Sequence, residues 1–287
     1  MKKFLIKIIA LFLIVGLNVN SFAFDPHRKI KVSVTSSHLY SLLKEICSDK
    51  LELTLIVPPI VSADNYELDR AVLTRMLRSN IILYHYWQDW AKRIKYEMGN
   101  LSIVYKELKT EGNLMIPYIN IRAAEEIAEM FGYLDPDNKQ FYEQNLVKYV
   151  YRVNHVASQI SVRASLKYHN KKIVCNNKLT DFMQWLGCDI IAEYGKPKNV
   201  SPAQITKIAK KIEKNNVQVV IDNLQTGTDI GEKLAKDLNI EQIVISNYPL
   251  NYSYIDTLKD NVLKIDKVLQ KENILQIDKI LQKAEKS

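Results

Sequence analysis

Glycine is scarce in this chain, and the glycine-rich loops that bind nucleotides are missing. The 287 residues include 8 glycines, and none of them is spaced as GxGxxG or GxxxxGK. Those loops let backbone N–H groups approach a phosphate closely, so their absence disfavours nucleotide binding. A GxSxG nucleophile elbow and an HExxH metal motif are also absent.

Cysteine is scarce too, with only Cys47, Cys175 and Cys188. There is no CxxC spacing, so a zinc site built from thiolates is not supported. An odd count leaves at least one unpaired thiol. Cys175 ends one predicted strand and Cys188 begins the next, which places them at opposite edges of a parallel sheet. A disulfide needs Cα atoms within about 7 Å, so we expect buried free thiols.

Long apolar runs are confined to the N-terminus. Lys2 and Lys3 precede an apolar run at residues 4–17, and small residues flank Phe22 at the end of the segment. This pattern predicts a cleavable signal peptide, residues 1–23, with cleavage after Ala23. An uncleaved membrane anchor is the alternative, although the run is short for a span of about 20 residues. No cysteine follows the run, so we expect no lipid attachment and a soluble periplasmic protein.

The mature chain also has only a small excess of positive over negative charge. The formal net charge of +8 falls to +5 once three lysines leave with the signal peptide. Along residues 258–286, lysines alternate with acidic residues, which is typical of a solvated helix face. We therefore expect no nucleic-acid partner.

What the chain does contain is a repeated alternation of strands and helices. The predicted strands cover 30–35, 51–57, 81–84, 102–105, 172–175, 189–192, 217–221 and 242–246, and the predicted helices cover 38–47, 67–77, 87–98, 179–185, 202–213 and 229–238. The fold class is therefore α/β, with two lobes that each hold a four-stranded parallel sheet flanked by helices.

One long helix is predicted between the lobes. Residues 138–168 contain no Gly or Pro, and their apolar residues recur with helical spacing. The alternative is two shorter helices with a kink. We expect residues 24–137 to form the N-terminal lobe and residues 138–168 a rigid connecting spine. Residues 169–287 would then form the C-terminal lobe, whose final helix packs back across the lobes.

Strand ends define a candidate ligand site. In open parallel sheets the carboxyl ends of the strands face the ligand crevice, so two facing lobes make a cleft. The residues placed there are Ser36, Ser37, His38, Asp64, Tyr84, His85, Asn176, Asn177, Glu193, Tyr194, Asp222, Asn223 and Asn247. His38, His85 and Asp64 form one candidate metal site; the alternative is that they are polar residues of the cleft rim.

Several segments, in order, resemble the zinc and manganese substrate-binding proteins of bacterial ABC importers, the group with a rigid connecting helix. VPPIVSADNYE is similar to that family's VPPGADPHDYE loop, and IAEMFGYLDPDNKQFYEQN is similar to its segment IAEALAKLDPENAATYEAN. The match runs from about Lys31 to Leu269. It implies a non-enzymatic, monomeric periplasmic protein. Such a protein captures a ligand in the cleft and delivers it to an ABC permease in the inner membrane.

The resemblance also implies where metal ligands would fall. The family's histidines fall on Asp64, Met115 and Asn177, and its late carboxylate on Asn223 or Asp222. Every histidine is replaced, and amide oxygens are poor zinc donors. Three accounts stay open: another ligand, which includes a different divalent metal ion; a site rebuilt from His38, His85 and Asp64; or a protein without a ligand. A protein that binds a siderophore-like or cobalamin-like metal chelate, and a non-binding interaction protein on the same scaffold, are the rivals.

Overall fold

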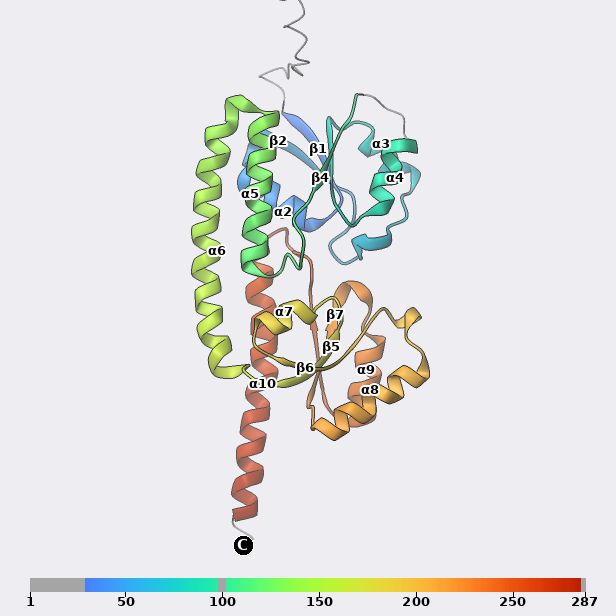
Figure 1. Cartoon of the computed structure of the whole chain (residues 1–287), viewed down its shortest axis with the longest axis vertical. Coiled ribbons are helices and arrows are strands. Elements are labelled where there is room, and N and C mark those ends of the chain that lie inside the picture. Colours follow the sequence, from blue (N-terminus) through green and yellow to red (C-terminus); the bar gives the residue numbers. More distant parts are fainter. Residues whose placement is uncertain (1–28, 98–101, 285–287) are drawn as a thin grey trace, which may run out of the picture.

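Two parallel sheets stacked end to end form the body of the protein (Figure 1). The computed structural model describes residues 29–97 and 102–284, and the predicted signal peptide lies outside them. Both sheets have four parallel strands in equivalent order, β2-β1-β3-β4 and β6-β5-β7-β8. The predicted fold class is confirmed.

The N-terminal sheet contains β1 (Ile30–Val34), β2 (Leu51–Leu55), β3 (Ile81–His85) and β4 (Val104–Leu108). Helices α2 (Ser37–Ile46), α3 (Arg70–Met76), α4 (Asp89–Glu97) and α5 (Pro117–Leu134) accompany it. The second sheet contains β5 (Lys172–Asn176), β6 (Asp189–Tyr194), β7 (Val219–Asn223) and β8 (Glu241–Ile245), with α7 (Thr180–Trp185), α8 (Pro202–Asn215) and α9 (Asp229–Leu238).

Local sequence signals account for many of the helix ends. The Ser36 side chain accepts a hydrogen bond from the backbone of Leu39 and caps α2. Ser201 and Gln204 form a reciprocal capping box at the start of α8, where Pro202 occupies the first turn. Asn216 ends α8 in the left-handed conformation that Asn tolerates better than most residues.

Two long helices flank the lobes: one runs along both lobes, and the other begins between them and runs along the second lobe and past it (Figure 1). One is α6 (Lys139–Lys167), a single helix of 29 residues, so the prediction of one long connecting helix is confirmed. The other is α10 (Tyr254–Ala284). The backbone N–H of Tyr254 donates to Ser41 in the first lobe, and Asp266 accepts from Tyr168 at the end of α6. The last helix therefore contacts the first lobe at its start and continues beside the second lobe.

A shared apolar core joins the lobes. It includes inward residues of both sheets together with buried side chains of α6, among them Tyr149, Val153 and Val156. The opposite face of each sheet has its own smaller core, under α3 and α4 in one lobe and under α8 and α9 in the other. Within the described ranges, no helix is both long enough and apolar enough to cross a membrane.

Several elements differ from the prediction in their bounds, and three differences have a clear physical reason or sequence signal. Helix α5 is not among the predicted helices, although its buried residues Ala124, Ile127 and Phe131 recur at helical spacing. Strand β4 continues to Leu108, because the edge of a sheet tolerates half-buried polar residues such as Lys106. Strand β7 begins two residues late, because the backbone N–H of Val217 still closes the end of α8.

Candidate functional site

A polar cavity of about 300 Å³ lies between the lobes, at the carboxyl ends of both sheets. Six of the residues predicted to lie in the cleft line it: His38, Asp64, His85, Asn177, Asn223 and Asn247. Strands β1 and β3 are hydrogen-bonded neighbours in register, so the segments that follow them meet at one edge of the sheet. The same relation holds for β5 and β7 in the second lobe.

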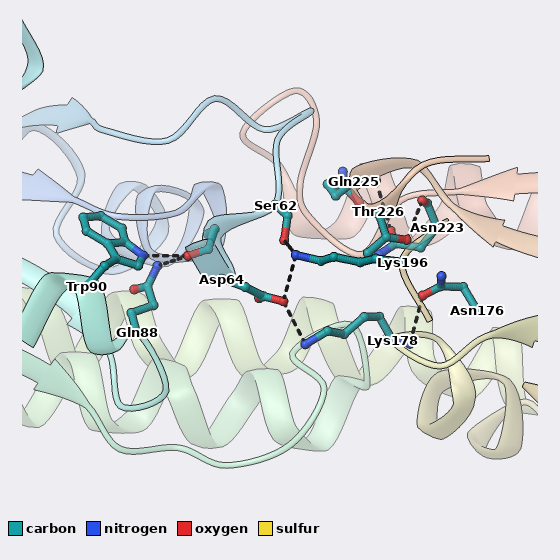
Figure 2. Close-up of polar contacts among 11 residues, drawn as sticks. Ser62, Asp64, Gln88, Trp90, Asn176, Lys178, Lys196, Asn223, Gln225 and Thr226 are labelled. Atoms are coloured by element: carbon teal, nitrogen blue, oxygen red, sulfur yellow. Dashed lines mark hydrogen bonds and ion pairs between the residues drawn. The ribbon is translucent and has the colours of Figure 1, made fainter. Parts of the chain in front are cut away.

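Asp64 is held in place by the turn that carries it, Ala63–Asn65. The carbonyl oxygen of Ala63 accepts hydrogen bonds from Gln88 Nε2 at 3.0 Å and Trp90 Nε1 at 2.9 Å, as Figure 2 shows. Both donors come from the segment after β3. Two side-chain donors on one carbonyl fix the turn, so the carboxylate of Asp64 has a defined position in the cavity wall.

Two lysines of the opposite lobe pair with that carboxylate (Figure 2). Oδ2 of Asp64 lies 3.0 Å from Nζ of Lys178 and 3.7 Å from Nζ of Lys196. Lys196 Nζ is also 3.4 Å from Oγ of Ser62. We call Ser62, Asp64, Lys178 and Lys196 the Asp64 cluster. One negative charge faces two positive charges there, so the carboxylate is already neutralised by ammonium groups.

Asn177 and Asn223 also lie at the carboxyl ends of strands, in the second lobe. Asn177 comes directly after β5, and its backbone N–H donates to Tyr194 O at 2.8 Å. The side-chain oxygen of Asn223 accepts from the backbone N–H of Gln225 at 3.4 Å. Both side chains belong to the cavity lining. They bring amide groups to it, and amides are poor zinc donors.

Met115 and Asp222 are not among the residues that line the cavity. Met115 is fully buried in the shared core, its carbonyl accepts from Tyr254 OH at 3.0 Å, and its neighbour Leu114 lines the cavity instead. Asp222 accepts from Tyr194 OH at 2.6 Å and from Gln242 Nε2 at 2.7 Å. Burial raises the pKa of Asp222, and these hydrogen bonds partly offset that effect.

Asp222 also requires glycine at position 231. A Cβ atom there would lie 1.8 Å from Oδ2 of Asp222, a distance that no side chain can adopt. The backbone N–H of Gly231 donates to this carboxylate instead. Asp222 therefore joins β7 to the start of α9 as a structural group.

His38 and His85 are almost completely buried in the cavity wall, with exposed fractions of 4% and 1%. Nε2 of His38 lies 2.7 Å from the carbonyl oxygen of Asn247, and Nε2 of His85 lies 2.6 Å from Oγ of Ser36. Burial lowers the pKa of His38 to about 4, and burial together with the nearby His38 lowers the pKa of His85 to about 3. Both imidazoles are neutral at neutral pH.

Hydrogen bonds also close the cavity across the lobes. Asn113 Nδ2 donates to Lys178 O at 3.0 Å, and Gln225 Nε2 donates to Pro59 O at 2.8 Å. With the contact of His38 to Asn247 and the Asp64 cluster, four separate polar links join the two lobes. The lysines and Gln225 were not predicted, because their partners come from distant parts of the sequence.

Three of the residues at the family's ligand positions meet at the cavity, without forming a recognisable metal centre. Within residues 29–97 and 102–284, no group of three or more His, Cys, Asp or Glu side chains could hold a metal ion. The three cysteines are free and buried, which confirms the prediction for them.

Two α/β lobes, a rigid connecting helix and a polar cavity between the lobes define the class of two-lobed ligand-binding proteins. The family model described as zinc-uptake complex component A, periplasmic, matches residues 115–268, and the chain belongs to this family. The resemblance seen in the sequence is confirmed.

Relatives extend the match beyond the family model. The high-affinity zinc uptake system protein ZnuA of Bacillus subtilis is 20% identical over 82% of this chain and 86% of its own length. A metal ABC transporter substrate-binding lipoprotein of Lactococcus lactis is 25% identical, and the match spans 63% of this chain and 62% of that protein. A crystal structure of ZnuA, 17% identical, covers 84% of this chain and all of that one at a TM-score of 0.72.

Proposed function

We propose that this protein is the substrate-binding component of a metal-type ABC importer, which captures its cargo between the lobes and delivers it to a membrane permease. The observation that carries the proposal is the polar cavity between the lobes, lined by strand ends of both lobes on the scaffold of this family. A long connecting helix and a cavity shared by two lobes suit capture and release of a small ligand, and we propose a binding role rather than an enzymatic one.

The protein acts outside the cytoplasm, as a monomer that has no role in nucleic-acid binding. The segment at residues 1–23 directs export and is cleaved after Ala23. Several relatives are described as lipoproteins. The sequence offers no cysteine after the apolar run for such an anchor, so we propose a free periplasmic protein.

The cargo is small. A cavity of about 300 Å³ lies at the lower end of the range for small-molecule sites, about 300–1,000 Å³. This volume favours a single ion or a small molecule over a large organic chelate. We propose that Asp64, Asn177 and Asn223 contribute to the cavity as polar lining, with Asp64 neutralised by Lys178 and Lys196.

The non-binding alternative has one observation in its favour, the same Asp64 cluster. An ammonium group beside Asp64 supplies the positive charge that a metal cargo would otherwise bring to this carboxylate. Metal analysis and native mass spectrometry of protein purified from the periplasm without chelators distinguish the two. Recovery of neither a metal nor a small ligand, in material that is folded, favours the non-binding protein.

Cross-linking in the native host tests the transport function. Affinity-tagged protein is cross-linked in intact cells and recovered from the membrane fraction, and its partners are identified by mass spectrometry. We expect the permease and the ATP-binding subunit of an ABC importer. A control variant that lacks residues 1–23 stays in the cytoplasm and should recover neither. Absence of importer subunits from the exported sample would reject the proposal.

A further inference from the structure

Two buried histidines in the cavity wall, His38 and His85, each have one ring nitrogen that makes no hydrogen bond within the described part of the chain. Nδ1 of His38 and Nδ1 of His85 are both buried, and neither has a hydrogen-bond partner among the described residues. A buried polar atom without a partner costs about 1–3 kcal/mol, so such atoms are uncommon in folded proteins. Neither histidine falls at a position where the family places its ligands, yet both line the same cavity.

The hydrogen bonds on the other nitrogen decide what Nδ1 of His38 can do. A carbonyl oxygen can only accept, so Nε2 of His38 carries the proton that it donates to Asn247. Nδ1 of His38 is then a bare lone pair. Metal-binding histidines commonly show this arrangement, in which one ring nitrogen donates to a carbonyl and so fixes the tautomer that exposes the other nitrogen.

Nδ1 of His85 can present a lone pair in the same way. Its Nε2 pairs with Oγ of Ser36, which also accepts from the backbone of Leu39. When Nε2 donates to this hydroxyl, Nδ1 of His85 is bare too. Ser36 caps helix α2 two residues before His38, so the hydroxyl that holds the ring of His85 lies on the same short piece of backbone as His38.

The charge around the two rings restricts the kind of ion that can bind there. Both rings are neutral, and aromatic rings pack against them: Trp87 stacks on His85 at 5.0 Å and Tyr248 lies 5.1 Å from His38. Asp64 and Asp181 line the same cavity, but the charge of Asp64 is neutralised by two lysines and Asp181 is exposed to solvent. The energy needed to bury an ion rises with the square of its charge, so a buried site whose two ligands are neutral favours a monovalent ion.

We propose that His38 and His85 form a two-coordinate site for a monovalent soft metal ion, copper(I), bound through the two Nδ1 atoms. Imidazole is a suitable donor for copper, and copper(I) carries the single charge that a site with two neutral ligands favours. The ion bound at this site is the cargo of the importer, so this inference rests on the proposed function. Because His38 also bonds to Asn247 of the opposite lobe, separation of the lobes admits the ion and closure restores that hydrogen bond.

Competition for copper(I) against the chromophoric chelator bicinchoninate, without oxygen, tests the site on the mature protein. We expect one copper(I) per chain. His38→Gln and His85→Gln should each weaken binding by more than about a hundredfold, beyond the loss that removal of an outer-shell partner causes. Gln keeps an amide donor for the oxygen partner of each ring. His155→Gln, at an exposed histidine of α6, is the matched control and should bind like the wild type.

X-ray absorption on the copper-loaded wild type covers the case in which a variant fails to fold. We expect two nitrogen ligands and no sulfur. Zinc(II) titrated into the same protein should bind far more weakly, because the two neutral imidazoles bring no negative charge to compensate the divalent ion. Absence of copper(I) binding, a sulfur-ligated ion, or full affinity in both cavity variants would overturn the proposal. Recovery of importer subunits by cross-linking does not depend on copper, so failure of this site is distinguishable from failure of the transport function.

Discussion

Asp64 pairs with two lysines, and the strength of these ion pairs depends on how exposed they are. The side chains of Asp64 and Lys196 are 19% and 23% exposed, whereas that of Lys178 is 47% exposed. Water screens the Lys178 pair, and such pairs contribute about 0–1 kcal/mol. A double-mutant cycle with Asp64→Asn and Lys178→Met should therefore give a coupling energy below about 1 kcal/mol, measured as free energy of unfolding in urea.

Lys196 should couple to Asp64 more strongly than Lys178, even though its ion pair is longer, because less water screens it. Lys198→Met, at an exposed lysine two residues away, is the matched control and should show no coupling. Equal coupling energies for Lys198 and Lys196 would contradict the assignment of the cluster.

Burial also determines the chemistry of the three thiols. It raises the pKa of Cys175 and Cys188 from 9.0 to about 12, and it raises the pKa of Cys47 as well. The thiolate is the reactive form, so a thiol reagent at pH 8 should modify none of the three in the native protein and all three in urea. A thiol that reacts rapidly in the folded protein would show that its burial is incomplete.

The same shifts predict how stability depends on alkaline pH. Above pH 9 the thiols of the unfolded chain lose protons, while those of the folded chain stay protonated until about pH 12. The unfolded state therefore binds fewer protons, and the free energy of unfolding falls as pH rises from 9 to 12. Cys175→Ala and Cys188→Ala should each make this decline shallower in urea titrations. An unchanged slope would mean that other groups produce it.

At the residue scale, the sequence could place Asp64 at the site because a proline-containing loop of recognisable pattern carries it. Its two lysine partners could not be predicted, because a salt bridge between lobes leaves no periodicity in either segment. The position that matches the family's second histidine shows another limit. Met115 points into the shared core, and Leu114 takes the adjacent place in the cavity wall. Alignment alone does not specify which of two consecutive residues faces a cavity.

At the scale of elements, the long connecting helix was predictable, whereas helix α5 and the edges of the sheets were not. The apolar stripe of α6 gave a helix whose bounds lie within one residue of the prediction. Strand β4 was misplaced because its second half carries polar residues at a sheet edge. The ends of β5 and β7 mattered most for the site, since Asn177 directly follows β5 and Asn223 ends β7.

Helix α6 offers a test of the shared core with controls on the same helix. Val153 is fully buried and Val147 is 69% exposed. Val153→Thr keeps the shape of the side chain but buries a hydroxyl, which should lower the free energy of unfolding by about 1–3 kcal/mol. Val147→Thr carries the same change in helix propensity and should alter stability by less than about 0.5 kcal/mol.

Urea unfolding of both variants measures the difference between them. Val156→Thr and the exposed Val162→Thr form a second pair with the same expectation. If the exposed variants lost as much stability as the buried ones, helix propensity rather than the shared core would explain the effect.

At the scale of the whole molecule, two different kinds of contact hold the lobes together. Polar links close the cavity, whereas α6 and α10 bind both lobes on the other side. Arg152 of α6 pairs with Glu45 in the first lobe, and Arg163 of α6 pairs with Asp266 of α10 at 2.8 Å. Helices that pack against both lobes restrict the motion to small rocking, because packed cores resist continuous deformation.

Breaking the polar links therefore should open the cavity without extending the molecule. We combine Asp64→Asn with Gln225→Ala, which removes both lysine pairs and the bond from Gln225 to Pro59. A compact chain of this size has a radius of gyration of about 18 Å. Small-angle scattering should show an increase of less than about 1 Å in the variant, because α6 and α10 keep the lobes aligned. Glu143→Gln, in an exposed pair within α6, is the control for the loss of a charge and should leave the profile unchanged. An increase of several ångströms in the double variant would instead mean that the polar links, rather than the two long helices, set the distance between the lobes.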